Sequence, residues 1–341
     1  MTVQKLEPTA QAMVAPGKGI LAADESTGTI QKRLASIGVE STEAYRRAYR
    51  ELLFTAEGAG ECLSGAILFD ETLRQSASDG RRLVDVLNAQ GIIPGIKVDK
   101  GAKALAGHPG ETVTEGLDGL RERLAEYADL GARFAKWRAV IHIGEGLPGR
   151  ACLAANAHTL ARYAALCQEA GLVPIVEPEV LMDGDHTIER CRDVTDATLE
   201  TVFGELLVQG VRLEDTVLKP NMVVSGSDCA EQAGVEQVAE WTIAALRRQV
   251  PAAVPGIAFL SGGQSEVEAT AHLNAMNAMG PQPWELSFSF GRALQQSALQ
   301  AWRGEAGNAE AAQAALLHRA HMNGLARSGK WRAELEQERA A

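Results

Sequence analysis

Apolar and polar residues follow two alternating patterns along this chain. Short runs rich in apolar and β-branched residues, typical of buried strands, are separated by longer stretches in which apolar residues recur at helical spacing. The eight strand-like runs cover residues 19–24, 65–69, 92–98, 134–141, 172–180, 216–223, 256–261 and 285–290. The clearest helical stretches cover residues 41–57, 116–130, 151–170, 196–209 and 235–249.

This alternation predicts an α/β fold. Strand–helix repeats form parallel sheets through right-handed crossovers, and eight of them can close into a (β/α)8 TIM barrel. Such a barrel needs about 250 residues, so the 341-residue chain leaves room for terminal helical additions. Because no Pro/Gly-rich linker divides the chain, we expect residues 1–341 to form a single domain. We expect the segment from residue 305 to be helical and the polar residues 331–341 to form a mobile C-terminal tail.

The alternative architecture is an open, doubly wound sheet that binds a nucleotide. Such a sheet usually carries GxGxxG after its first strand, but residues 21–28 read LAADESTG. The phosphate-binding pattern GxxxxGK followed by Ser or Thr does not occur either. The missing nucleotide motifs favour the closed barrel.

Composition narrows the class of protein. Hydrophobic residues make up 46% of the chain and charged residues 23%, as in ordinary globular proteins. The net charge of −11 argues against a general nucleic-acid binder, so any cationic site must be a local pocket. Residues 1–14 show no signal-peptide pattern, and no apolar run approaches the roughly 20 residues of a membrane span. We therefore expect a cytoplasmic protein with neither nucleic acid nor a membrane as a partner.

Cysteine and histidine positions do not predict a metal site. The five cysteines are widely spaced without a CxxC pair, which fits a reducing compartment and argues against a disulfide framework or a zinc site. The seven histidines show no paired spacing at the ends of the strand-like runs, and His318 with His321 is more typical of a solvated helix face. We expect neither a metal nor another cofactor.

Lys219 stands in the middle of an apolar, β-prone run, TVLKPNMV. Desolvating an ammonium group is costly unless the amine is neutral or paired, and proteins usually accept that cost for chemistry, because a desolvated lysine supplies a nucleophilic amine. Lys97 and Lys136 lie in similar runs. One such lysine could be a paired structural charge, whereas three of them indicate a pocket for an anion.

Strand periodicity places further polar residues beside these lysines. Alternate side chains of a strand share a face, and most of these polar groups lie toward the carboxyl end of their runs, where barrels build active sites. Any one of them alone could be a paired core ion. Crowding by cations favours a neutral amine at Lys219. Together they predict one catalytic mouth formed by Asp24, Lys97, Lys136, Arg138, Glu177, Glu179 and Lys219.

A phosphate site is expected after the seventh and eighth runs. Glycine amides in a turn that leads into a helix bind anions, and barrels often bind phosphate on these two loops. A Gly-Gly pair also marks any tight turn, which is the alternative interpretation. The residues expected here are Ser261, Gly262, Gly263, Ser289, Gly291 and Arg292. Lys32 and Arg33 could hold a second phosphate or form a solvated helix face.

Six segments of the chain resemble class I fructose-bisphosphate aldolase. They are APGKGILAADES (residues 15–26), GIKVDKG (95–101), FAKWR (134–138), VPIVEPE (173–179), LKPNM (218–222) and FLSGGQSE (259–266), and the similarity extends from about residue 14 to 329. The resemblance implies a metal-free barrel enzyme that cleaves fructose 1,6-bisphosphate reversibly to dihydroxyacetone phosphate and glyceraldehyde 3-phosphate in glycolysis and gluconeogenesis. It also implies a homotetramer whose partner is a phosphorylated sugar.

The resemblance also assigns roles to the residues of the mouth. Lys219 matches the Schiff-base lysine, Glu177 the acid/base, Asp24 the group that handles the C4 hydroxyl proton, Lys136 a lysine that assists carbinolamine chemistry, and Glu179 a carboxylate that supports the lysines. Ser261, Gly262, Gly291 and Arg292 match the phosphate site next to the ketone. Ser26, Arg33, Arg46 and Lys97 match contacts toward the second phosphate.

The chain departs from the family pattern at three places. Animal and plant members end in a tyrosine that aids proton transfer at the enamine, but the last tyrosine here is Tyr163. Phe290 stands where tyrosine is common, and Thr29 where serine is. The absent terminal tyrosine motivates one alternative, another Schiff-base aldolase that prefers a monophosphate sugar. A second alternative, a non-catalytic scaffold, comes from the resemblance, since family members bind other proteins.

Overall fold

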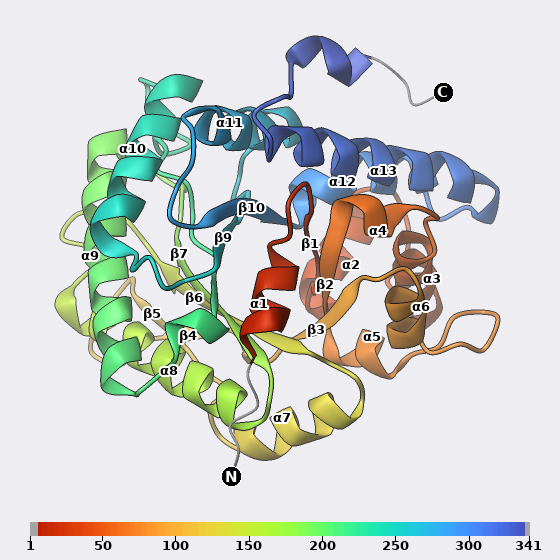
Figure 1. Ribbon diagram of the computed structural model, residues 1–341, viewed down its shortest axis with the longest axis horizontal. Coiled ribbons are helices and arrows are strands. Elements are labelled where there is room, and N and C mark those ends of the chain that lie inside the picture. The colour runs from red at the N-terminus through yellow and green to blue at the C-terminus, as the bar shows by residue number, and fades with distance from the viewer. Residues whose placement is uncertain (1–5, 338–341) are drawn as a thin grey trace.

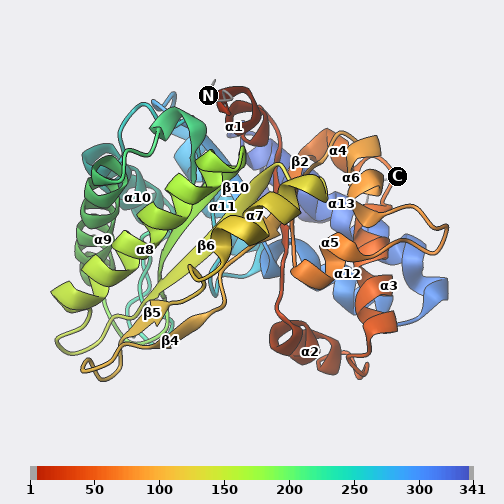
Figure 2. The ribbon, with the colours of Figure 1, turned by 90° about the horizontal axis from the view of Figure 1, so that it is seen from below.

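The computed structural model describes residues 6–337. Eight parallel strands close into a barrel in chain order, with the last strand paired to the first, and helices surround it (Figures 1 and 2). This confirms the predicted (β/α)8 barrel and excludes the open sheet. The strands are β1 (Gly19–Ala23), β2 (Leu63–Leu68), β3 (Ile93–Lys97), β6 (Phe134–Ile141), β7 (Val173–Val180), β8 (Val217–Leu218), β9 (Gly256–Phe259) and β10 (Glu285–Phe290).

The barrel closes although strand β8 is much shorter than the run predicted at residues 216–223. The Lys219 amide still donates to the Val176 carbonyl of β7 at 2.8 Å. Pro220 then has no amide hydrogen to continue the ladder. Lys219 is therefore the last residue with a backbone bond to β7 before the chain leaves the sheet.

Helices cover the outside of the barrel. The predicted helical stretches are present as α3 (Glu43–Phe54), α7 (Leu120–Asp129), α8 (Arg150–Glu169), α9 (Ile188–Val208) and α10 (Val235–Gln249). Helix α9 begins well before residue 196, at a cap where the Thr187 side chain accepts the Arg190 amide at 3.4 Å. The main helices are α2 (Thr27–Ala35), α3 (Glu43–Phe54), α6 (Leu83–Ala89), α7 (Leu120–Asp129), α8 (Arg150–Glu169), α9 (Ile188–Val208), α10 (Val235–Gln249), α11 (Glu266–Ala278), α12 (Arg292–Trp302) and α13 (Ala309–Ala326). Shorter helical segments are α1 (Glu7–Met13), α4 (Ala59–Cys62), α5 (Asp70–Arg74), η1 (Leu213–Asp215), η2 (Ala306–Asn308) and η3 (Ala333–Gln337). No helix within residues 6–337 is long and apolar enough to cross a membrane.

Two additions to the barrel were not predicted as separate elements. Helix α1 packs Leu6 and Met13 into the same apolar cluster as Ile20 and Phe134, so it covers the amino-terminal end of the barrel interior. After β3, an antiparallel hairpin of β4 (Ala102–Ala104) and β5 (Thr112–Thr114) extends from the opposite end. This leaves the carboxyl ends of the strands as the open mouth.

The C-terminal segment leaves α13 along the outside of the barrel (Figure 1). Trp331 packs against the main core, and its indole nitrogen donates to Glu336 Oε1 at 2.8 Å. Glu336 also pairs with the buried Arg319 of α13. Trp331 and Glu336 of the expected mobile tail thus contact the rest of the protein, while residues 338–341 lie outside the described part.

Aromatic side chains pack closely where neighbouring strands carry glycine, Phe134 inside the barrel and Phe288 in the core between barrel and helices. A Cβ atom on Gly95 of β3 would lie 2.2 Å from the Phe134 ring, and one on Gly19 of β1 would lie 2.5 Å from the Phe288 ring. Both rings are fully buried. Interiors are packed to crystal density, so a large ring on one strand requires a missing side chain on its neighbour.

We predict that Gly95→Ala lowers the free energy of unfolding by about 1–3 kcal/mol, because its methyl group would overlap the Phe134 ring. Gly204→Ala is the matched control: this α9 glycine has nothing within 4 Å of a Cβ, so alanine should stabilise the helix by about 0.5–1 kcal/mol. Urea unfolding measures both. Equal stabilities of the two variants would contradict the packing argument.

Candidate active site

A cleft of about 1160 Å³ opens at the carboxyl ends of the strands. Its lining includes all seven charged residues expected from strand periodicity, contributed by β3, β6 and β7 and by residues just beyond β1 and β8. It also includes Ser26, Arg33, Ser261, Gly262, Ser289, Gly291 and Arg292. Arg46 and Gly263 are the two predicted site residues outside the lining.

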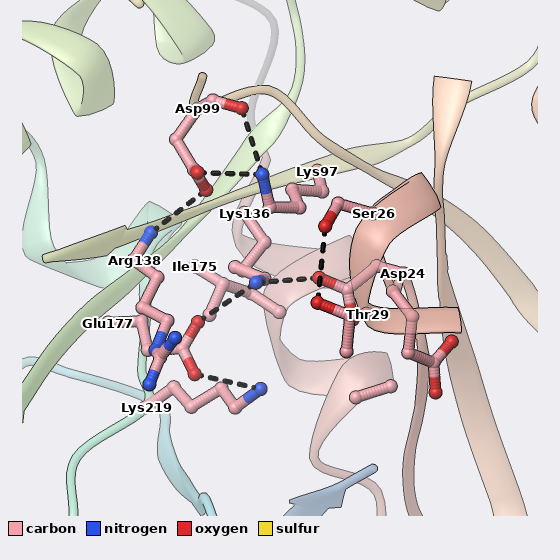
Figure 3. A network of polar contacts seen from close by, with 12 residues as sticks. Asp24, Ser26, Thr29, Lys97, Asp99, Lys136, Arg138, Ile175, Glu177 and Lys219 are labelled. Carbon is pink, nitrogen blue, oxygen red and sulfur yellow. Dashed lines mark hydrogen bonds and ion pairs between the residues drawn. The ribbon is translucent and has the colours of Figure 1, made fainter. Parts of the chain in front are cut away.

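Glu177 lies at the centre of this cleft between two lysines (Figure 3). Its Oε1 atom is 3.1 Å from Lys219 Nζ, and its Oε2 atom is 3.1 Å from Lys136 Nζ. Lys136 Nζ also lies 2.6 Å from Asp24 Oδ2. All four residues are buried. Four ionisable groups from four different segments therefore form one connected chain of charge.

The strand register explains how these groups meet. In the β6–β7 ladder Lys136 is opposite Ile175 and Arg138 is opposite Glu177, so both cationic side chains of β6 point to the face that carries the glutamates of β7. A slip by one residue would send each set to the opposite face. Lys219 enters from the end of β8, the next strand along.

Electrostatics fix the protonation states of three of these groups. Burial would raise the pKa of Asp24, but Lys136, Lys219 and Lys97 outweigh it and hold that pKa well below its usual value. Burial would lower the pKa of Lys136, but Asp24 and Glu177 raise it well above its usual value. Near neutral pH, Lys136 is thus a cation and Asp24 an anion.

Glu177 is also held as an anion while keeping one oxygen able to accept a proton. Burial would raise its pKa, yet Lys136, Lys219 and Arg138 lower it below the usual value. Its Oε2 atom accepts no hydrogen bond from residues 6–337, because the contact with Lys136 has ion-pair geometry only. Its Oε1 atom lies 3.1 Å from Lys219 Nζ, where an ionised carboxylate can act as a base.

The rim of the cleft carries further cations on carboxylate supports. Lys97 Nζ lies 2.7 Å from Asp99 Oδ1, and Asp99 Oδ2 accepts the backbone amide of Arg138 at 3.2 Å (Figure 3). The Arg138 side chain pairs with Glu179. Glu179 was expected to support the lysines, but its ion pair within the described chain is with Arg138. Asp99 was not singled out, although it lies two residues after Lys97 and therefore shares its strand parity.

Glu25 is a second residue that the sequence reasoning missed. It is buried and pairs with both Arg33 and Arg50, and Gln295 Nε2 donates to it at 3.0 Å. Burial would raise its pKa, but the two arginines lower it. Glu25 therefore holds Arg33 at the cleft. The sequence gave no sign of this, because Glu25 lies beyond the end of β1, where strand periodicity no longer applies.

Arg46 was expected to contact the second phosphate, but the structure places it elsewhere. Its Nε and Nη2 atoms donate to Glu71 at 2.8 and 2.5 Å, and its Nη1 atom donates to the Ser41 carbonyl at 2.7 Å. Three of the guanidinium donors are engaged by the protein, and Arg46 lies outside the cleft lining. The structure therefore does not bring Arg46 together with the other site residues.

The loop that leads into α11 and the N-terminus of α12 meet at one end of the cleft. Ser261 and Gly262 come just before α11, and Gly291 is the N-cap residue of α12, whose first residue, Arg292, lies at the cleft. Helix N-termini carry free amide hydrogens and a partial positive charge, which suits a phosphate. The buried Ser289 hydroxyl has no hydrogen-bond partner within residues 6–337 and lines the same end.

The departures from the expected pattern lie in different surroundings. Phe290 is fully buried, and its ring centre lies 5.5 Å from that of Phe288. This departure is therefore in the core and not in the cleft. The Thr29 hydroxyl lies 3.2 Å from the Ser26 hydroxyl, on the cleft side of α2 (Figure 3).

Within residues 6–337, no group of three or more His, Cys, Asp or Glu side chains could hold a metal ion.

Comparisons with known proteins agree with this geometry. The family model described as "Glycolytic: Fructose-bisphosphate aldolase class-I" matches residues 5–341. A probable fructose-bisphosphate aldolase class 1 of Xanthomonas axonopodis pv. citri is 61% identical, with 97% of this chain and 100% of that protein covered. Fructose-bisphosphate aldolase 6, cytosolic, of Arabidopsis thaliana is 58% identical over 94% of this chain and 89% of that protein.

A solved structure shows the same relationship. Fructose-bisphosphate aldolase from Plasmodium falciparum, determined in complex with TRAP and a small-molecule inhibitor, superposes with a TM-score of 0.95. Its sequence is 51% identical, and the match covers 96% of this chain and 95% of that one. The likeness thus extends over the whole barrel.

We predict a pH-dependent stability contribution from Asp24. Because its pKa is lower in the folded protein than the ordinary 3.8, the contribution is complete above that value and is lost as the pH falls toward the folded pKa. Asp24→Asn should be roughly 2–4 kcal/mol less stable at pH 7, since it leaves the buried Lys136 short of a partner. Urea unfolding between pH 7 and 3 should show this gap narrowing at the acid end.

Glu240→Gln, which removes an exposed carboxylate on α10, is the control for this measurement. Its unfolding free energy should follow that of the unaltered protein across the pH range. Parallel curves for Asp24→Asn and the unaltered protein would show that Asp24 does not carry the contribution.

Proposed function

The chain belongs to the class I fructose-bisphosphate aldolase family, and from this premise we propose how its cleft cleaves fructose 1,6-bisphosphate through a Schiff base on Lys219. The enzyme is a lyase that acts on a phosphorylated sugar. The observation that carries the assignment is the carboxylate of Glu177, which bridges Lys219 and Lys136 with its two oxygens. Such an arrangement serves an amine that must lose a proton and later help to expel water.

The first steps form the imine. Glu177 Oε1, 3.1 Å from Lys219 Nζ, takes a proton from the ammonium group, and the neutral amine attacks the ketone carbon. A proton returned to the carbinolamine hydroxyl lets it leave as water, which yields the iminium ion. The fixed positive charge of Lys136 stabilises negative charge that develops on the oxygen during the attack.

Carbon–carbon cleavage then uses Asp24. Its carboxylate, held ionised by Lys136, accepts the proton of the C4 hydroxyl while the C3–C4 bond breaks. The bond electrons move into the iminium group, which becomes an enamine, and the aldehyde product leaves. A protonated imine takes up these electrons far better than the parent ketone. Protonation of the enamine carbon and hydrolysis of the imine release dihydroxyacetone phosphate.

Substrate positioning falls to the two ends of the cleft. Ser261, Gly262, Ser289, Gly291 and Arg292 would bind the phosphate next to the ketone. Ser26, Arg33, Lys97 and Arg138 would bind the other phosphate and the neighbouring hydroxyl groups. Binding at both ends fixes the scissile bond relative to Lys219 and contributes remote binding energy to the transition state.

We further propose a homotetramer located in the cytoplasm. Leu207 and Val208, at the end of α9, are 64% and 77% exposed and suit a subunit contact. The cytoplasmic location is supported by the Arabidopsis relatives named cytosolic and by five free cysteines. Light scattering on the purified chain measures the number of subunits, and a monomer would contradict the proposed tetramer. Cell fractionation tests the location, and a secreted protein would contradict the proposed cytoplasmic location.

We predict that borohydride traps substrate on Lys219. Incubation with dihydroxyacetone phosphate and borohydride should reduce the imine to a stable secondary amine, which peptide mass spectrometry locates at Lys219. Lys219→Met should form no adduct and lose activity by at least about 10³-fold, because Asp24 and Glu177 hold the neighbouring Lys136 as a cation, which cannot attack the ketone. Lys100→Met, which removes an exposed lysine of the cleft lining, should still be trapped. An adduct at another lysine would contradict the assignment.

We predict that Arg33 distinguishes the bisphosphate from the monophosphate. Arg33→Met should raise KM for fructose 1,6-bisphosphate about tenfold, because a charge-assisted bond to the distal phosphate is lost. It should leave KM for fructose 1-phosphate unchanged. Arg47→Met, which breaks a pair with Glu51 on the surface of α3, is the control. Equal effects on both sugars would place Arg33 at a different part of the substrate.

A further inference from the structure

The side chain of Gln295 reaches from helix α12 to the end of strand β1. Its Nε2 atom donates to the Ala22 carbonyl oxygen at 2.8 Å and to Glu25 Oε1 at 3.0 Å. Its Oε1 atom accepts the Tyr49 hydroxyl at 3.1 Å. The side chain is buried, and both partners of Nε2 are acceptors, so only this orientation of the amide pairs every group. Gln295 is therefore held in one position.

The two acceptors of this amide lie on either side of Asp24 in the chain. Strand β1 ends one residue before Asp24, so the carboxylate stands on the segment just beyond the strand. Within residues 6–337 this carboxylate has one ion-pair partner, Lys136 Nζ at 2.6 Å. The amide of Gln295 thus holds the chain on both sides of the group that takes the C4 hydroxyl proton.

Tyr49 of helix α3 supports the far side of the same amide. Its ring is fully buried and stacks on Trp302 of α12, with 5.3 Å between the ring centres. Burial raises the pKa of its hydroxyl above the usual value, so the group stays protonated and donates to Gln295. No sequence pattern drew attention to Gln295, because its bond to the Ala22 carbonyl joins residues 273 positions apart.

We propose that Gln295 is a positioning residue for Asp24. The carboxylate must lie within hydrogen-bond reach of the C4 hydroxyl when the C3–C4 bond breaks, and a misplacement of about 1 Å costs on the order of 10²-fold in rate. Methionine at this position would be of similar length but would leave the Ala22 carbonyl and Glu25 short of a donor. The segment that carries Asp24 would then lose its link to α12. The inference rests on the proposed role of Asp24.

The alternative is that Gln295 acts only on Arg33, because Glu25 Oε1 also pairs with that arginine. The bond to the Ala22 carbonyl favours the first role, since it fixes the backbone of β1 and does not involve Arg33. The two roles affect different quantities. A displaced Arg33 weakens substrate binding and raises KM, whereas a displaced Asp24 slows carbon–carbon cleavage. Imine formation, which uses Glu177, should continue in both cases.

The test compares Gln295→Met, Tyr49→Phe and Gln300→Met in single turnovers with fructose 1,6-bisphosphate. Gln295→Met should slow aldehyde formation about tenfold while KM stays within about twofold. Borohydride should trap as much dihydroxyacetone phosphate on Lys219 as in the unaltered enzyme. Tyr49→Phe removes only the hydroxyl that holds the amide, so it should slow aldehyde formation about threefold even if Gln295→Met does not fold. Gln300→Met, on the exposed side of α12, should match the unaltered enzyme.

An unchanged rate of aldehyde formation in both Gln295→Met and Tyr49→Phe would overturn the proposal. So would a raised KM with an unchanged rate, which would assign Gln295 to Arg33, and an equal loss of imine trapping, which would indicate general damage to the cleft.

Asp24→Asn in the same assay separates the two levels of inference. If it leaves the rate unchanged, the proposed role of Asp24 itself fails. If it lowers the rate, adding Gln295→Met should slow the Asp24→Asn enzyme no further, because the group to be positioned is already lost. A further loss of about tenfold in the double variant would show that Gln295 acts independently of Asp24, and only the positioning role would fail.

Discussion

The carboxylate of Glu177 between two ammonium groups is the contact on which the rest of the site depends. A buried charge is tolerated only when its neighbours replace the water it has lost. Glu177 does this for Lys136 and Lys219 together, and Asp24 completes the set from the opposite side of Lys136. Removing any member leaves another charge unbalanced, so the same contacts that permit burial also set the protonation states that the reaction requires.

This requirement extends outward to residues that do not touch the reacting bond. Asp99 supports both Lys97 and the backbone of Arg138, and Glu25 supports Arg33 while it is itself held by Arg50 and Gln295. Long cationic side chains lose much rotamer entropy when they are ordered. Carboxylates that pair with these cations order them before substrate binds, so less rotamer entropy is lost on binding. In this way a protein with a net charge of −11 keeps a pocket for an anion.

Strand β7 connects the two halves of the mechanism. Glu177 faces the reactive amine, Glu179 holds the arginine of the rim, and the segment just beyond the strand contacts the phosphate loop through Met182. Strand β7 is buried along its whole length. The same piece of backbone therefore positions the proton-transfer group and contacts the phosphate loop. Positions of catalytic groups must hold within fractions of an ångström, and a shared strand supplies that precision.

The sequence by itself determined the barrel and most of the mouth. Eight strand-like runs and strand parity depend on local periodicity, which each segment carries within itself, so Lys136, Glu177 and Lys219 could be placed together before any contact was known. Only the tertiary structure decided which charged and polar groups pair with each other. Arg46 pairs with Glu71, Glu179 pairs with Arg138, and the Gly263 amide donates to the sulfur of Met182. These outcomes join segments distant in the chain, and the energy of a buried polar group depends on which partner the fold brings within reach.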